Sequence, residues 1–444
     1  MKEVYIAAAT VIGKKRVPQP SEDFKPIIIF TVDELQGNAV FLNIGEEIDN
    51  VRLYGHKGGE WIYVDDVQYF TYNLSRELFA AVVNGDYITD YTDDGTFAIG
   101  CSEEHYNEVR SRIKLLEYVQ EVGSSAIISY LNIAASTIER LIFTDAGLYD
   151  FWPCNSLTYV DLQKNNLAVF EGVGGNITYL NLNSNANLTK ITTEEFPELT
   201  KLECRHCALE EFTALPTLPK IKQLYIDDNH LSGKIYLESP ALERIQIGDN
   251  EEVTELEIIS GATQLKNVDA KNCTHLETIS VPYDSLSELN LQNTGFFRIS
   301  IVGAQKLKTV NVSKCIQLNS CELKQNPTLS NVKLDGCTAL RSLNLANNAL
   351  KEFDTTKTKV PALSNLYIYN NNNLSSLNVS GVVGRVLAYN CPFSNDEESA
   401  QAFADSLKTL ESGQTSELQV NGTQYDLIAA AATAAGWTVI NPNA

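Results

Sequence analysis

From about residue 128 onward, apolar and polar positions recur in one repeating order. Each unit reads apolar, two variable residues, apolar, one variable, apolar, two variable, then Asn or Cys. Successive copies are 20 to 23 residues apart, because the second apolar position falls at residues 160, 180, 202, 224, 245, 268, 289, 310 and 332. A fixed period of this length is typical of a solenoid of stacked coils, and it predicts about a dozen of them.

The chemistry of each repeat position predicts its place in the coil. Alternating Leu, Val and Ile would form a short strand whose side chains point inward and stack on the next coil. The Asn or Cys that follows would turn inward and bond backbone groups that the turn leaves unpaired. The predicted buried ladder consists of Asn165, Asn185, Cys207, Asn229, Asn250, Cys273, Cys315, Cys337, Asn348, Asn371 and Cys391.

Each coil also carries a second apolar triplet, such as Val253-Leu256-Ile258. These triplets are strand-like and leave no room for a full helix, so the second side of the coils is predicted to be another sheet or extended segments.

The repeat register breaks once, because 34 residues separate Val332 from the equivalent Leu366. Either one coil carries an insertion at 351–362, or the two half-repeats exchange roles. We favour the insertion, since Asn348 and Asn371 both keep the ladder position if Leu343 begins a new coil.

The segment ALRSLNLANNALKEFD, together with TVNVSKC before it and NLSSLNVSGV after it, resembles the short, internalin-like leucine-rich repeats of bacteria. The tail LQVNGTQYDLIAAAATAAGWTVINPN resembles the segment that closes such arrays in bacterial and bacteriophage proteins. The resemblance covers about 128–444 and implies a β-rich leucine-rich repeat solenoid with α/β caps. It implies no particular ligand, because the family shares a scaffold and not a partner.

The two ends of the chain differ from the repeats. Apolar residues at helical spacing predict a helix over about 103–122, within a cap at 101–127 that covers the first coil of a solenoid at 128–393. The final segment, 394–444, alternates helix and strand patterns and is predicted to be an α/β cap. Residues 1–100 contain β-type runs without a repeat, which predicts a small β-rich domain and a candidate attachment module.

Charge and cysteine content narrow the functional classes. The formal net charge is −22, so the average field repels nucleic acid and anionic membranes. We find no apolar window long enough for a transmembrane helix and no secretory signal at the start, which predicts no direct membrane insertion. The nine cysteines are spread along the chain, which favours reduced thiols over a disulfide framework.

No motif in the sequence predicts catalysis or a cofactor. Cys204 and Cys207 form a CxxC pair, but the repeat register assigns both to structural positions. The five histidines are scattered without a metal-binding pattern. The acidic stretch Asp86, Asp90, Asp93 and Asp94 misses the EF-hand spacing and is interpreted as a solvated turn rather than a calcium site. We therefore expect a protein that is not an enzyme and holds no metal.

The remaining candidates for function are side chains that flank the inward strand positions and would share one concave face. Tyr with Asn, Asp and Arg is typical of adaptable recognition, although Tyr is also simply a good strand residue on a half-exposed face. The middle coils would add Asn267, Asp269, Glu288, Asn290, Asn311 and Lys333. The predicted binding residues are Tyr159, Tyr179, Arg205, Tyr225, Asp227, Arg244, Tyr367, Tyr369 and Tyr389.

The sequence thus predicts a non-catalytic scaffold that binds a protein or a glycan. We expect a bacteriophage virion component, associated with tail or capsid, on the basis of the closing segment and the absence of a signal at the start. The alternative is an internalin-like adhesin of the bacterial cell surface.

Overall fold

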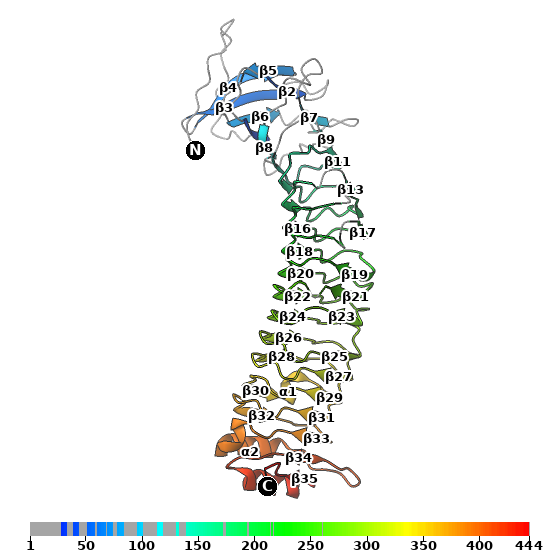
Figure 1. The fold of residues 1–444 in the computed structure, drawn as a ribbon, viewed down its shortest axis with the longest axis vertical. Helices are drawn as coiled ribbons and strands as arrows, with labels where there is room; N and C mark the ends of the chain where they lie inside the picture. The colour runs from blue at the N-terminus through cyan, green and yellow to red at the C-terminus, as the bar shows by residue number, and fades with distance from the viewer. Residues whose placement is uncertain are drawn as a thin grey trace. The chain divides into compact units, whose positions relative to one another are not determined.

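The computed structural model describes residues 139–443, apart from 172–174, 193–194, 214, 216 and 260, and before residue 139 it describes the backbone of nine strands, β1 to β9. The chain divides into two compact units, Met1–Ile221 and Lys222–Ala444. Both are built from short strands connected by turns (Figure 1). The fold is a parallel β-solenoid of about 14 turns with little helix, which confirms the predicted leucine-rich repeat architecture.

In the first unit, the repeat strands pair in parallel and in one register. Leu141, Val160, Leu180 and Leu202 align across neighbouring strands, and each is fully buried. The strands are β10 (Arg140–Phe143), β12 (Tyr159–Asp161), β14 (Tyr179–Asn181) and β16 (Lys201–Glu203). A second parallel sheet is formed by β13 (Val169–Phe170), β15 (Lys190–Ile191) and β17 (Glu211–Phe212).

Strands β1 to β7 all lie within residues 1–100, and they extend two sheets of the same unit. The first sheet continues from β10 through β8 (Ile113–Tyr118), β1 (Ile28–Val32), β6 (Leu78–Val83), β3 (Val51–Lys57) and β4 (Glu60–Val67). The other contains β11 (Asp150–Trp152), β9 (Tyr130–Asn132), β7 (Thr96–Gly100), β2 (Ala39–Asn43) and β5 (Tyr69–Asn73). The predicted strand content of residues 1–100 is therefore present.

The helix predicted over about 103–122 is wrong at its centre, where β8 forms instead. Strand β8 pairs in parallel with β10 and antiparallel with β1. The first repeat strand needs a partner for its free backbone edge, and this long-range pairing outweighs the helical spacing of the apolar residues. The remainder of the predicted helix lies outside the described residues.

In the second unit, one sheet consists of the strands that carry the repeat motif up to residue 333. We call it the motif sheet, and its strands run parallel in a constant register. They are β18 (Gln223–Tyr225), β20 (Arg244–Gln246), β22 (Asn267–Asp269), β24 (Glu288–Asn290), β26 (Thr309–Asn311) and β28 (Asn331–Lys333).

The second apolar triplets form strands as well, which confirms the second sheet that they predict. One group is β19 (Gly233–Leu237), β21 (Val253–Ile258) and β23 (Thr278–Ser280). The triplet strands β25 (Arg298–Ser300) and β27 (Ser320–Glu322) begin another sheet, which we call the back sheet. It continues with β29 (Ser342–Asn344), β31 (Asn365–Tyr367), β33 (Arg385–Leu387), β34 (Glu417–Gln419) and β35 (Thr438–Ile440).

The predicted insertion at 351–362 is wrong, and the alternative, an exchange of roles between half-repeats, is correct. The motif strand β29 pairs with β27 in the back sheet and not with β28, and β31 and β33 follow β29 in the same sheet (Figure 1). Residues 351–362 instead contain β30 (Glu352–Asp354), which pairs with β32 (Ser376–Asn378), and the short helix α1 (Thr355–Thr358). The exchange is possible because Leu318-Cys321-Leu323 already has the same apolar alternation as the motif, so either side of the coil can accept it.

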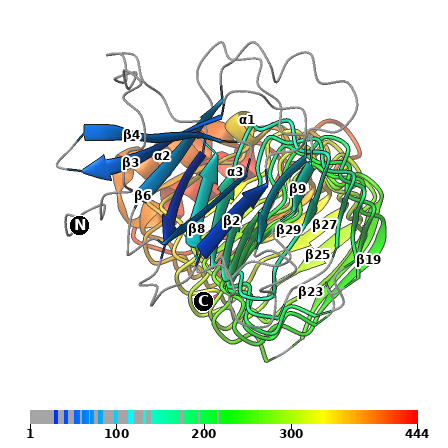
Figure 2. The same cartoon turned by 90° about the horizontal axis from the view of Figure 1, so that it is seen from above.

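The C-terminal segment has the predicted order of helix, strand, helix and strand. It begins with a 3₁₀ turn (Pro392–Asn395) and α2 (Glu397–Ser406), whose N-cap Asp396 accepts a hydrogen bond from the Ser399 backbone amide. Helix α3 (Tyr425–Ala434) follows β34, and Gly436 then adopts a φ of 92° at the helix end. In Figure 2, α2 lies on the side opposite the strands β25, β27 and β29. No helix in the described part of the chain is long and apolar enough to cross a bilayer.

Candidate functional site

Buried side chains at the ends of the repeat strands fix the coils to one another. Asn250 is fully buried, and its Nδ2 donates to the Ile226 and Ile247 carbonyls at 2.9 and 2.8 Å, while its Oδ1 accepts from the Leu231 amide at 3.0 Å. Asn185 makes the same pattern in the first unit. Cysteine in this position donates one hydrogen bond to a carbonyl, as from Cys273 Sγ to the Ile247 carbonyl at 3.3 Å.

The ladder residues belong to two series, because the motif changes sheets. The residues of the first series follow the motif strands, and one of them, Thr294, was not predicted. The first series consists of Asn165, Asn185, Cys207, Asn229, Asn250, Cys273, Thr294, Cys315 and Cys337. Cys207 is half-buried and the others are buried. Asn348, Asn371 and Cys391 were expected to continue this series, but they lie behind the back sheet strands with Asn326, which forms the second series.

The residue before each ladder position adopts a left-handed backbone conformation. For example, the φ angles of Asp249, Asn272 and Asn293 are 58°, 59° and 57°. Asn and Asp tolerate this region better than other non-glycine residues. Their side chains also bond along the stack, from Asn272 to Asp249 at 2.7 Å and from Asn293 to Asn272 at 3.1 Å.

In the first unit, the predicted contact residues Tyr159 and Tyr179 are stacked on each other, with ring centroids 4.4 Å apart. The Arg140 guanidinium lies 3.7 Å from the Tyr159 ring centroid, and the Lys201 ammonium lies 5.3 Å from that of Tyr179. Burial and the nearby Glu203 carboxylate raise the pKa of Tyr179. Arg205, another predicted contact residue, forms an ion pair with Glu203 at 3.6 Å. These rings and charges thus have internal partners, and the stack stiffens the sheet face.

The remaining predicted contact residues do not share one surface. Tyr225 is only 9% exposed, and its hydroxyl donates to Gln223 in the same strand. Its ring is therefore too buried to serve as a contact surface. Asp227 lies two residues after the end of β18. Tyr367, Tyr369 and Tyr389 belong to the back sheet side, not to the motif sheet of Arg244, because of the exchange of half-repeats.

Two of these tyrosines are paired with each other on the back sheet side. The Tyr369 and Tyr389 rings stack with centroids 4.6 Å apart and an interplanar angle of 8°. Arg385 on β33 donates to Glu417 at 3.1 Å.

A groove of about 220 Å³ crosses the motif sheet of the second unit, and we call it the sheet groove. Asn267 Nδ2 donates to Glu288 at 2.7 Å, and Asn290 Nδ2 donates to Asp269 at 3.0 Å. Side chains of both charge signs and several amides therefore meet on one rigid sheet. The groove is lined by Arg244, Ile245, Gln246, Asn267, Val268, Asp269, Glu288, Leu289, Asn290, Thr309, Asn311 and Lys333, which includes the predicted middle-coil residues.

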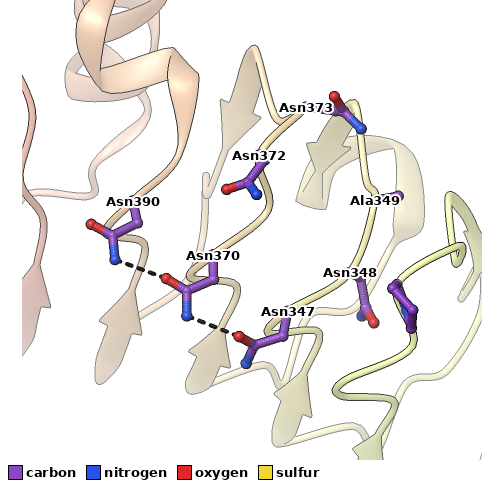
Figure 3. A pocket seen from close by; sticks show the side chains of 8 residues that line it. Asn347, Asn348, Ala349, Asn370, Asn372, Asn373 and Asn390 are labelled. Carbon is purple, nitrogen blue, oxygen red and sulfur yellow. Dashed lines mark hydrogen bonds between the residues drawn. The ribbon is translucent and has the colours of Figure 1, made fainter. Parts of the chain in front are cut away.

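A second hollow of about 620 Å³ lies along the turns that follow the back sheet strands, and we call it the asparagine groove (Figure 3). Asn347, Asn370 and Asn390 form a row in which Asn370 donates to Asn347 at 2.9 Å and Asn390 to Asn370 at 2.8 Å. Asn372 and Asn373 lie on the other side of the hollow. This groove was not predicted. The run Asn370 to Asn373 was a signal for it, because the turn itself requires Asn only at its left-handed and ladder positions.

The described residues contain no group of three or more His, Cys, Asp and Glu side chains that could hold a metal ion. The Cys204 and Cys207 sulfurs are 3.7 Å apart, and the hydrogen bond between the two thiols, together with burial, raises the pKa of Cys204. The eight cysteines in the described part of the chain are free thiols. The acidic stretch Asp86, Asp90, Asp93 and Asp94 lies outside the described residues.

Comparison with known proteins finds similarity at the level of solved structures. No family model matches the chain, and no curated protein matches it. The functional domain of InlJ from Listeria monocytogenes, which includes a cysteine ladder, is 17% identical over 60% of this chain and 70% of its own, with a TM-score of 0.25. A leucine-rich repeat protein from Bacteroides ovatus is 13% identical over 79% and 97%, with a TM-score of 0.29. YopM from Yersinia enterocolitica is 18% identical over 62% and 82%, with a TM-score of 0.20.

Proposed function

We propose that this protein is a non-catalytic recognition module that binds a partner protein through the sheet groove. The supporting observation is the row of Arg244, Asn267, Glu288 and Lys333 along one groove of the motif sheet. Their backbone positions are fixed by strands that pair in a constant register. A surface that presents both charge signs and amide groups on paired strands suits the mixed polar surface of a protein.

The buried ladders support the same function indirectly. Each ladder Asn or Cys forms hydrogen bonds to backbone carbonyls behind the sheet and so connects neighbouring coils. The strands that carry the groove residues are thereby already ordered, which reduces the loss of conformational entropy on binding.

Charge reversal at Glu288 tests the sheet groove. Glu288→Lys should weaken partner capture about tenfold or more, because it places a cation beside Arg244 and removes the acceptor of Asn267. Glu277→Lys is the matched control, since Glu277 is exposed in the turn before β23 and does not line the groove. Affinity capture followed by titration of the identified partner gives the comparison, and equal loss or equal retention in both variants would contradict the proposal.

As the setting we propose a bacteriophage virion, on the resemblance of the closing segment, with a bacterial surface adhesin as the alternative. Antibodies raised against residues 139–443 should label purified phage particles from the source strain. Labelling of intact bacterial cells in the absence of phage would favour the adhesin.

A further inference from the structure

The asparagine groove differs from the rest of this acidic protein because no charged side chain lines it. The chain carries a formal net charge of −22, whereas the groove is lined by Pro327, Asn347, Asn348, Ala349, Asn370, Asn372, Asn373 and Asn390. Because the lining offers no charge to pair with an ionic group, the groove suits a neutral ligand that forms hydrogen bonds.

The hydrogen bonds within the groove leave a defined set of groups for a ligand. The row is head-to-tail: Asn370 donates to Asn347, Asn390 to Asn370, and Asn421 to Asn390 at 2.7 Å. Asn347 ends the row, and its Nδ2 has no partner among the described residues. Each amide further along uses one of its two N–H groups in the row.

Asn372 and Asn373 face this row across the hollow and are exposed (Figure 3). Neither side chain has a hydrogen-bond partner within the described part of the chain. Each therefore offers two donors and one carbonyl acceptor, and the groove presents donors and acceptors from both walls.

The hollow itself follows from the size of one residue. Pro327, Ala349 and Asn372 each come directly after a residue of the second ladder series, and all three line the groove. Ala349 is the smallest of them, so it leaves space between its neighbours and adds an apolar surface with Pro327. The ladder residue Asn348 beneath it is held at 2.6 and 2.9 Å to the Leu323 and Leu345 carbonyls, which keeps the groove in shape.

We propose that the asparagine groove binds a neutral glycan of one or two sugar residues. Sugar hydroxyls both donate and accept, which matches the free amides of Asn347, Asn372 and Asn373. The C–H face of a sugar ring suits Pro327 and Ala349. The volume of about 620 Å³ is within the range of small-ligand sites.

The site is separate from the sheet groove, so a protein partner and a glycan would be recognised by different residues of the same unit. Each proposal can therefore fail without the other.

Saturation-transfer difference NMR on the full chain tests the site, with methyl glycosides of glucose, galactose, mannose and N-acetylglucosamine and with lactose and maltose as probes. At least one neutral sugar should bind at millimolar concentration. Ala349→Phe fills the hollow and should abolish the signal, while Asn373→Ala should weaken binding about threefold to tenfold through loss of one amide.

Asn331→Ala is the matched control, because Asn331 is exposed on β28 and does not line the groove. It should leave the NMR signal unchanged. Circular dichroism checks that the variants fold, and Asn372→Ala takes the place of Ala349→Phe if that variant does not. Failure of every sugar in the panel to bind, binding that survives all of the groove variants, or binding of a tetra-alanine peptide in place of the sugars would overturn the proposal.

Discussion

The two ladder series in the second unit solve the same packing problem with different proportions of Asn and Cys. From Asn229 to Cys337 the first series has two asparagines, three cysteines and one threonine, whereas three of the four residues in the second series are asparagines. Asn250 and Asn371 have nearly identical surroundings although they lie behind different sheets. The local motif thus determines the environment of the ladder residue, and it does not determine which sheet the motif joins.

The difference between Asn and Cys in this position lies in the number of backbone groups that each satisfies. Asn371 donates to the Leu345 and Ile368 carbonyls at 2.9 and 2.7 Å and accepts from the Leu350 amide at 3.2 Å. Cys337 donates to the Val312 carbonyl at 3.0 Å. A thiol therefore fills the space as a small apolar group and contributes less hydrogen bonding.

The largest effect is expected from removing a ladder amide. Asn250→Ala and Asn371→Ala should each lower the free energy of unfolding by about 4 kcal/mol, because several buried backbone groups lose their partners. Urea unfolding of both variants measures the loss. If the two losses differed by more than twofold, the equivalence of the two series would be wrong.

Alkaline pH should weaken the thiol positions selectively. Burial raises the pKa of Cys273 and of Cys337 to about 12 and that of Cys391 to about 11. Since an unfolded thiol ionises near pH 8.5, the stability is intact below that pH and falls above it until the folded pKa is reached, by up to about 1.4 kcal/mol per pH unit for each thiol.

Cys273→Ala provides the measurement. The stability of the variant should fall less steeply between pH 9 and pH 11 than that of the unaltered protein, as followed by urea unfolding. Parallel slopes for the two proteins would show that the thiol ionises equally in both states.

At neutral pH the same substitution should have a smaller effect than the loss of an amide. Cys273→Ala removes one hydrogen bond to the Ile247 carbonyl and one buried sulfur, and we expect a loss of about 1 to 2 kcal/mol. Thermal unfolding of Cys273→Ala and Asn250→Ala under the same conditions compares the two losses of stability. A loss in Cys273→Ala as large as that in Asn250→Ala would refute the distinction between the two residue types.

A buried polar group without a partner should behave in the opposite way. Ser239 is fully buried, and its Oγ has no hydrogen-bond partner among the described residues. Ser239→Ala removes a hydroxyl that is costly to bury, so the protein should become more stable by about 1 kcal/mol. A measured destabilisation by urea unfolding would show that this hydroxyl is bonded in solution.

The candidate sites were predictable from the sequence to different degrees. The middle-coil residues of the sheet groove follow directly from strand alternation, because every second residue of a motif strand must face outward. Tyr225 shows the limit of this argument, since an outward position can still be covered by neighbouring side chains. The asparagine groove depends on which turns lie side by side, and on the small size of Ala349 relative to residues one coil away.

The coil length, the inward positions and the kind of residue at the end of each strand could be predicted from the amino-acid sequence alone. These features depend on local alternation and on a period that one coil can satisfy. Long-range pairing was needed to establish which sheet each motif strand joins, that β8 is a strand, and which polar residues meet in a groove. Both sides of a coil need an apolar triplet, so the choice between them is made by pairing with strands that lie far away in the sequence.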